Sequence, residues 1–335
     1  MVNETYYEVF TVAESICFIT YFTLVVILGG IGNLFVIYAS RCYSSFDLDR
    51  VTILFVQHLA IADCSKILFM TIPMLTNHLY YLTHPNNSQW YLPYSIAKLS
   101  YFLLAFANNS VGFFILAVSL HRLARCLSPT RLQQSGIKNA RLIMGLLWFL
   151  ALLFASAVLF LPTSYHMYYT LCSLDITEEL SSFLNVFAEY TNYPLLALIF
   201  LVVILANTTS LIYTFILTKD SPNVNFRQAN LTILAISLGM IVCNCWLPYQ
   251  MIILYYSSKV GDHSPSNIQK YAIPLTTASS LINPILYTVV NKGFKKFAVK
   301  VVRRGFGRVT GQDTINRSSF GESSAVRRNR CEPGI

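Results

Sequence analysis

The sequence predicts an all-α membrane protein, a seven-transmembrane helix bundle followed by a short amphipathic eighth helix. Of its 335 residues, 55% are hydrophobic and only 12% are charged, whereas ordinary globular domains carry about 25% charged residues. Seven apolar runs each exceed the roughly 20 residues that cross about 30 Å of hydrocarbon. The runs lie near residues 15–40, 51–81, 95–121, 142–162, 190–218, 229–256 and 268–290.

The charges between the runs orient the predicted bundle. Lys and Arg gather after the first, third, fifth and seventh runs, whereas the N-terminus and the other linkers together hold mostly acidic residues, concentrated before the first run and after the fourth. Because cytoplasmic loops carry the excess of Lys and Arg, we expect the N-terminus outside the cell and the C-terminus inside, in the plasma membrane. The expected parts are an extracellular N-terminus at 1–14, the bundle at 15–290, the eighth helix at 291–304 and a disordered cytoplasmic tail at 305–335.

The eighth helix is predicted from the stretch "NKGFKKFAVKVVRRGF", which mixes Phe and Val with cations at helical spacing. A helix with one apolar and one basic face lies on a membrane surface, so we expect it to contact the anionic lipids of the inner leaflet.

The composition argues against several other classes of protein. The net charge of +9 does not indicate nucleic-acid binding, because the basic residues flank apolar runs and form no separate domain. The 8 cysteines include no CxxC pair, so no zinc site is expected. Asp63 is the only carboxylate inside the apolar runs, and no Ser and His stand at catalytic spacing, so we expect neither an enzyme nor a cofactor. A polytopic transporter is the less favoured alternative, because the chain shows no internal repeats.

Polar residues and prolines inside the runs form a distinctive set. Gly32-Asn33 lies in the first run, "LAIAD" ends at Asp63 in the second, "CWLP" covers 245–248 and "NPILY" covers 283–287. The further members are Arg122 followed by Pro129, Trp148 and Pro194. Together these residues resemble the rhodopsin-like (class A) G-protein-coupled receptors along essentially the whole membrane region.

This resemblance implies a receptor that binds an extracellular ligand and activates a heterotrimeric G protein, with arrestin as a further candidate partner. It also implies that an activation switch controls helix movement at the inner end of the bundle. The switch residues that it implies are Asn33, Asp63, His121, Arg122, Trp246, Pro248, Asn283, Pro284 and Tyr287.

The Asn-Pro pair inside the seventh run has a physical reading of its own. Pro284 has no backbone N–H to donate, which loosens the helix there. Asn283 and neighbouring polar groups are expected to satisfy the freed backbone if they face the bundle interior. A buried charge is costly in lipid, so we expect Asp63 to be paired, with Asn33, Asn283 and Ser280 as its partners.

Lys66 departs from the family pattern, which implies a sodium site at Asp63. Lys66 follows Asp63 by three residues and so lies on a neighbouring face of the same helix. Either its ammonium partly replaces sodium as the counter-ion of Asp63, or it points into the ligand cavity and binds an anionic group. The sequence leaves both alternatives open.

The inner and outer ends of the bundle also depart from the family pattern. His121 stands where an acidic residue usually holds Arg122, and no acid begins the sixth run, which predicts raised basal signalling. Ala97 stands where the family has the Cys that bonds the second outer loop. A Cys17–Cys172 bond and a free Cys172 therefore both remain open.

The ligand class is predicted from the outer half of the chain. Leu104 replaces the Asp of amine receptors and Thr277 replaces the retinal Lys of opsins, so neither class is expected. The acidic and aromatic second outer loop favours a peptide by charge complementarity. A lipid or small chemosensory ligand is the alternative. The candidate cavity residues are Lys66, Leu104, Asn108, Trp246, Tyr249, Gln250 and Thr277.

Covalent modification is predicted on both sides of the membrane. The sequons at Asn3 and Asn86 fall on the outer side, where N-glycosylation takes place. Cys331 lies beyond the basic stretch and is a candidate for lipidation.

Overall fold

The computed structural model describes the membrane helices and one hairpin. The residues described are 11–42, 50–83, 94–127, 137–156, 163–168, 171–176, 198–216, 239, 245–246, 267–290 and 292–309. The labelled helices are α1 (Val12–Leu24), α2 (Gly30–Cys42), α3 (Arg50–Lys66), α4 (Ile72–Thr83), α5 (Tyr94–Leu127), α7 (Ile137–Ser156), α10 (Asn267–Val290) and α11 (Lys292–Val309). The strands are β1 (Thr163–Tyr168) and β2 (Leu171–Ile176).

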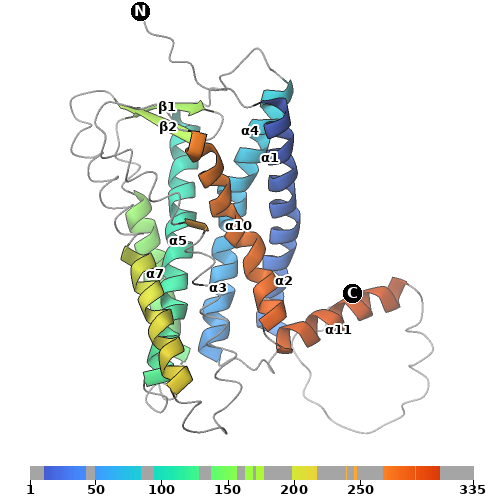
Figure 1. Cartoon of the computed structure of the whole chain (residues 1–335), viewed down its shortest axis with the longest axis vertical. Coiled ribbons are helices and arrows are strands. Elements are labelled where there is room, and N and C mark those ends of the chain that lie inside the picture. The colour runs from blue at the N-terminus through green and yellow to red at the C-terminus, as the bar shows by residue number, and fades with distance from the viewer. Residues whose placement is uncertain are drawn as a thin grey trace, which may run out of the picture.

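Long apolar helices run side by side and form the bundle (Figure 1). Within the described residues, 5 helices are long and apolar enough to cross a membrane. They are Val12–Arg41, Arg50–Tyr80, Phe102–Leu127, Asn139–Ser156 and Leu198–Ile216. Helix α10 supplies the expected seventh crossing, and Gly239, Cys245 and Trp246 are the helical residues described from the sixth.

The first two crossings are each interrupted by a π-helical turn. One turn, Val25–Gly29, joins α1 to α2, and the other, Ile67–Thr71, joins α3 to α4. The two turns contact each other across the bundle. Such turns insert an extra residue into a helix and occur often at functional sites, and here the second turn begins directly after Lys66.

Several helix ends differ from the bounds that hydropathy indicated. Helix α5 continues to Leu127, past the predicted end of the third run at 121, and Arg122 within this extension is buried. Helix α7 begins at Ile137, before the predicted start of the fourth run at 142. Helix α1 begins with a capping box, in which the Thr11 backbone N donates to Glu14 Oε2 over 2.7 Å and the Glu14 backbone N donates to Thr11 Oγ1 over 3.2 Å. These bonds satisfy backbone donors at the start of the helix.

The sequence analysis did not predict the hairpin. Strands β1 and β2 pair antiparallel, with Ser164 opposite Asp175 and Met167 opposite Cys172. Aromatic and β-branched residues such as Tyr165 and Ile176 favour extended backbone. The hairpin lies across the end of the bundle at which α1 begins, and β1 contacts α5 (Figure 1).

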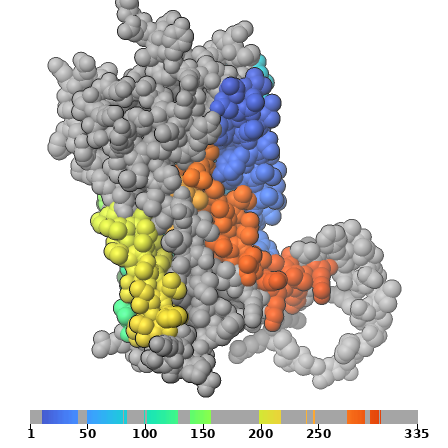
Figure 2. All heavy atoms as spheres, in the orientation of Figure 1, coloured from blue at the N-terminus to red at the C-terminus, as the bar shows by residue number. Residues whose placement is uncertain are grey.

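The outside of the bundle is apolar and its interior contains the polar residues. Leu142 is 76% exposed and Phe215 and Val289 are each 70% exposed, which suits hydrocarbon better than water. Asn33, Asp63, Lys66 and Asn283 are all fully buried. Figure 2 shows α1, α10 and the helix Leu198–Ile216 forming parts of one outer face.

Helix α11 leaves the bundle at an angle to α10 (Figure 1). Its Phe294 is fully buried, and the ring of Phe297 packs on Phe35 and Tyr38 with centroid distances of 5.8 and 5.9 Å. Lys295 and Lys296 are exposed. The predicted eighth helix is therefore amphipathic, and it runs to Val309 rather than to 304.

Candidate functional site

Asp63 is the centre of a polar network in the middle of the bundle. Its side chain is fully buried on α3. Ser280 Oγ donates to one carboxylate oxygen over 2.7 Å, and Asn283 Nδ2 donates to the other over 2.8 Å. Both donors come from α10, as the sequence analysis predicted, so the carboxylate joins the second crossing to the seventh.

Asn33 has a different partner from the one predicted. Its Nδ2 donates to the carbonyl of Ser280 over 2.8 Å and to the carbonyl of Gly29 over 2.9 Å, and it makes no bond to Asp63. In a helix the carbonyl of residue 280 would accept from the N–H of residue 284, but Pro284 has none. Asn33 therefore satisfies the acceptor that Pro284 leaves free, a task that the sequence analysis gave to Asn283 and its neighbours.

Two glycines of the first crossing let α10 come close enough for this bond. A Cβ on Gly32 would lie 2.7 Å from Pro284 Cγ, and a Cβ on Gly29 would lie 3.1 Å from the carbonyl oxygen of Ser280. The first distance is shorter than real Cβ contacts, so any larger residue at Gly32 would push α10 away. The Gly32-Asn33 pair thus acts together with Pro284, one residue by its size and the other by its amide.

Lys66 reaches across the bundle to α10. Its side chain is fully buried, and Nζ donates to the carbonyl of Thr276 and to Ser279 Oγ, the latter over 3.1 Å. Nζ also lies 4.4 Å from the centroid of the Trp246 ring, within the range of a cation–π interaction. Lys66 and Asp63 form no direct ion pair in the described part of the chain. Both predicted roles of Lys66, as counter-ion of Asp63 and as ligand-binding cation, stay predictions.

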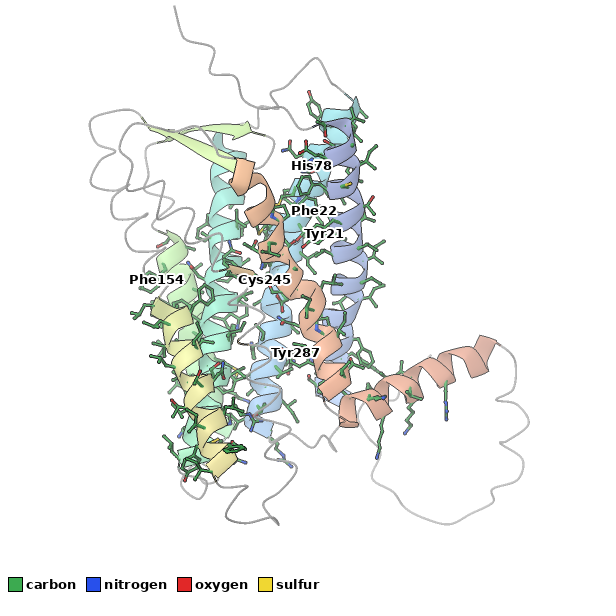
Figure 3. All side chains as sticks on the ribbon, viewed as in Figure 1. Tyr21, Phe22, His78, Phe154, Cys245 and Tyr287 are labelled. Carbon is green, nitrogen blue, oxygen red and sulfur yellow. The ribbon has the colours of Figure 1, made fainter. Side chains whose placement is uncertain are left out.

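The inner end of the bundle contains Arg122 and Tyr287. Arg122 is 3% exposed, and its Nη2 lies 3.5 Å from Thr52 Oγ1 near the start of α3. Tyr287 is fully buried near the end of α10 and packs on Phe294 of α11, with ring centroids 6.2 Å apart. Figure 3 shows Tyr287 near the α11 end of α10, with Cys245 nearer the middle of the bundle. Helices α2 and α10 both end here and α3 begins here, so the two predicted switch residues share one end.

His121 precedes Arg122 and packs against a different group. Its ring lies 5.7 Å from the ring of Phe55 on α3. The position that usually carries an acid is therefore occupied by an aromatic contact between α5 and α3.

Among the predicted cavity residues, Thr277 serves as a contact between helices. It is fully buried and donates to the carbonyl of Pro274 over 2.7 Å. Tyr21 on α1, which the sequence analysis did not single out, has its hydroxyl 2.9 Å from the same carbonyl and 3.0 Å from Thr277 Oγ1, so its one proton can be donated to either oxygen. Figure 3 shows Tyr21 facing α10 in the outer half of the bundle. The sequence signal for this contact was the polar hydroxyl of Tyr21 within an apolar run.

The other predicted cavity residues that the structure describes lie on two helices. Leu104 and Asn108 are part-buried on α5, and Trp246 is 2% exposed. Asn108 Oδ1 and Trp246 Nε1 are both buried without a hydrogen-bond partner. Buried polar atoms of this kind need an explanation, and a bound ligand or water would supply their missing bonds.

A second polar contact joins α5 to the helix Leu198–Ile216. Asn207 Nδ2 donates to Ser119 Oγ over 3.2 Å. A Cβ on Gly239 of the sixth crossing would lie only 2.1 Å from Asn207 Nδ2. The fifth and sixth crossings are therefore in close contact at this level. The Asn207 amide that makes the contact was not among the residues singled out from the sequence.

Several predicted sites are not joined or fall outside the described residues. Cys17 is a free, exposed thiol on α1, so the predicted Cys17–Cys172 bond is not formed in this structure. Cys172 lies on β2, opposite Met167. The sites outside the described residues are Asn3, Asn86, Pro248, Tyr249, Gln250 and Cys331.

Comparisons with known proteins identify relatives along nearly the whole chain. Residues 32–287 match the model of the "7 transmembrane receptor (rhodopsin family)". Galanin receptor 2a of Danio rerio is 25% identical over 318 residues, covering 91% of this chain and 82% of that receptor. The C3a anaphylatoxin chemotactic receptor of Danio rerio is 22% identical over 314 residues, covering 91% and 80%. Chemerin-like receptor 2 of Rattus norvegicus is 25% identical over 289 residues, covering 82% and 75%.

Proposed function

Because this chain belongs to the rhodopsin family of seven-transmembrane receptors, and is thus a multi-pass membrane receptor rather than an enzyme, we propose that it binds an extracellular peptide and activates a heterotrimeric G protein. In this proposal it resides in the plasma membrane with its N-terminus outside. The hairpin then lies at the ligand end, and Arg122 and Tyr287 lie at the G-protein end.

One observation supports the signalling role above the others, the polar network around Asp63. It joins α3 to α10 through Ser280 and Asn283, at the level where Pro284 weakens the helix. A carboxylate held by two donors costs much less to bury than a bare charge, but the network is only as stable as its geometry. A kinked helix with internally satisfied bonds has two packings of similar energy, which is what a switch requires.

The switch connects the two ends by direct contacts. Trp246 lies over Lys66, and Lys66 is bonded to Thr276 and Ser279 on α10. Four residues beyond Ser279, Asn283 bonds Asp63, and one turn later Tyr287 packs on Phe294 of α11. Movement of Trp246 by a ligand therefore changes contacts along the same helix face that reaches the inner end.

A peptide is favoured as the ligand by the relatives and by the outer end. Two of the similar proteins are named galanin receptors and C3a receptors, and both names specify receptors for peptides or small proteins. The hairpin sequence contains Tyr165, Tyr168 and Asp175, and acidic and aromatic residues complement a basic peptide. A lipid ligand is the outcome that would replace this part of the proposal.

The inner end supports raised basal signalling. His121 takes the place of an acid that would hold Arg122 in the resting state, and its ring packs on Phe55. A neutral imidazole attracts a guanidinium far less than a carboxylate does.

The proposal is tested by expressing the full chain in cells that contain a promiscuous G-protein reporter and applying a peptide library. We expect a basic peptide to raise the reporter signal, and Arg122→Ala to abolish that response at equal surface expression. Thr20→Ala is a matched control, because Thr20 bonds only its own helix carbonyl at Ile16 on the exposed side of α1. Responses to lipid extracts alone would show that the peptide assignment is wrong.

A further inference from the structure

The family implies a sodium ion beside Asp63, and the residues around Asp63 test whether one fits. Both carboxylate oxygens already accept hydrogen bonds from Ser280 and Asn283. A fully buried ammonium, that of Lys66, is present one helical turn away on the same helix. A second monovalent cation would be repelled by this fixed charge in a low-dielectric interior. The residues present therefore do not fit sodium.

We propose that the Lys66 ammonium is the resident cation of this polar core and that the receptor needs no diffusible sodium ion. The proposal extends the first of the two alternatives from the sequence, because the ammonium balances Asp63 through space while other groups hold it in place. It also does not depend on which ligand the receptor binds.

The position of the ammonium is fixed by three contacts from two other crossings. The Thr276 carbonyl and Ser279 Oγ accept its protons from α10. The face of Trp246 lies 4.4 Å away on the sixth crossing. These groups carry no net charge, so they do not balance the charge of the ammonium. Among the described residues, the buried carboxylate one helical turn away is that of Asp63. An uncompensated ammonium at this depth would be strongly unfavourable, and Asp63 supplies the opposite charge.

Two orphan oxygens could seem to favour a metal ion. Asn33 Oδ1 and Asn283 Oδ1 are buried without a hydrogen-bond partner. Water fits each of them better than sodium does, because a neutral donor can bond such an oxygen without repulsion from Lys66. The proposal therefore assigns water to these two oxygens.

The position over Trp246 gives the tethered cation a second role. Because one ammonium contacts Trp246 and α10 together, displacement of the indole by a ligand removes part of its stabilisation. A diffusible ion can leave when the core rearranges, whereas Lys66 cannot. Lys66 therefore balances the charge of Asp63 before and after the bundle rearranges.

The test compares the thermal unfolding of the purified full chain in sodium chloride and in choline chloride, both at about 0.15 M ionic strength. We expect wild type to have the same Tm in both salts. Lys66→Met, which keeps the length and removes the charge, should lower Tm by roughly 10 °C in choline, the loss expected when one partner of a buried pair is removed. Sodium should restore part of that loss. Ser65→Ala is the control, because Ser65 bonds only the Ile61 carbonyl of its own helix.

The double variant Asp63→Asn/Lys66→Met separates charge balance from packing. With both charges removed, its Tm should exceed that of Lys66→Met in choline and should not respond to sodium. The proposal is overturned if wild type gains Tm in sodium over choline and Asp63→Asn abolishes that gain. It is also overturned if Lys66→Met unfolds at the wild-type Tm, or if Asp63→Asn fails to recover any of its loss.

A direct readout covers the case in which Lys66→Met does not fold. Titration of the wild-type chain by ²³Na NMR should show no line broadening that Asp63→Asn removes, and such broadening would contradict the proposal. Neither readout uses a ligand or a G protein, so failure of the proposed function and failure of this inference give different results.

Discussion

Replacing Asn33 with Leu removes the donor that satisfies the Ser280 carbonyl. Asn33 Nδ2 lies 2.8 Å from that carbonyl, which has no N–H partner because residue 284 is proline. Leu keeps the branched shape of the Asn side chain but is larger and cannot donate, so a second background is needed to separate the lost hydrogen bond from the change in volume. A buried carbonyl left without a partner costs about 1–3 kcal/mol, and in hydrocarbon no water replaces the donor.

The lost hydrogen bond predicts a lower Tm for Asn33→Leu, and the size of the decrease should depend on Pro284. At about 2–4 °C per kcal/mol for a chain of 150 to 250 residues, Asn33→Leu should lower Tm by between about 2 and about 12 °C. In a Pro284→Ala background the helix regains an N–H at position 284, which can bond the Ser280 carbonyl. Asn33→Leu should then cost much less.

The assay is a double-mutant cycle on the purified receptor, with Tm measured for wild type, both single variants and the double variant. A coupling of at least about 1 kcal/mol between the two positions is expected for a shared hydrogen-bond acceptor. Thr20→Ala should change Tm little in either background, since its bond to Ile16 lies on the outside of α1. Equal losses from Asn33→Leu in both backgrounds would refute the assignment of Asn33 to the acceptor freed by proline.

Three further variants probe the close contacts and the inner end. Gly32→Ala places a Cβ 2.7 Å from Pro284 Cγ and should lower Tm by several degrees, a loss that Pro284→Ala should reduce; an unchanged Tm would contradict the close packing. Gly239→Ala places a Cβ 2.1 Å from Asn207 Nδ2, so it should separate the fifth and sixth crossings and raise ligand-independent reporter signal, whereas a signal unchanged at equal surface expression would argue against it. His121→Asp should lower ligand-independent signal by giving Arg122 a carboxylate partner, and an equal or higher basal level would show that this reasoning is wrong.

Hydropathy and charge predicted the bundle well because the bilayer limits the choices. A crossing helix must be about 20 apolar residues long and must satisfy its own backbone, so the runs locate the helices almost independently of their packing. The third run was placed too short, since Arg122 counts as polar in a hydropathy window although the structure buries it. Whether a charged residue faces lipid, water or protein depends on tertiary contacts.

The sequence predicted which residues form the candidate site, but it did not predict all of their hydrogen-bond partners. Asp63, Ser280 and Asn283 were placed together correctly, because a buried carboxylate needs donors and those residues follow a motif. The partner of Asn33 was wrong, since spacing alone does not show that Pro284 leaves the Ser280 carbonyl free on the side facing the first crossing. The contacts of Lys66 depend on a long flexible side chain and on a π-helical turn that begins just after it, and neither is readable from the sequence.

The hairpin was missed for a different reason. Its strands are 6 residues each, lie outside the apolar runs and carry no turn signal such as Asn-Gly. Short strands in a long polar loop are stabilised by contacts with the rest of the fold, here with α5.

The most direct test of the central claim is guanine-nucleotide exchange on purified heterotrimeric G proteins by the full chain in lipid vesicles. Without any ligand, wild type should accelerate exchange above protein-free vesicles, and Arg122→Ala should return it to that background while remaining folded at the temperature of the assay. Exchange at the background rate with every class of G protein, or a rate that Arg122→Ala leaves undiminished, would contradict the account of this chain as a signalling receptor.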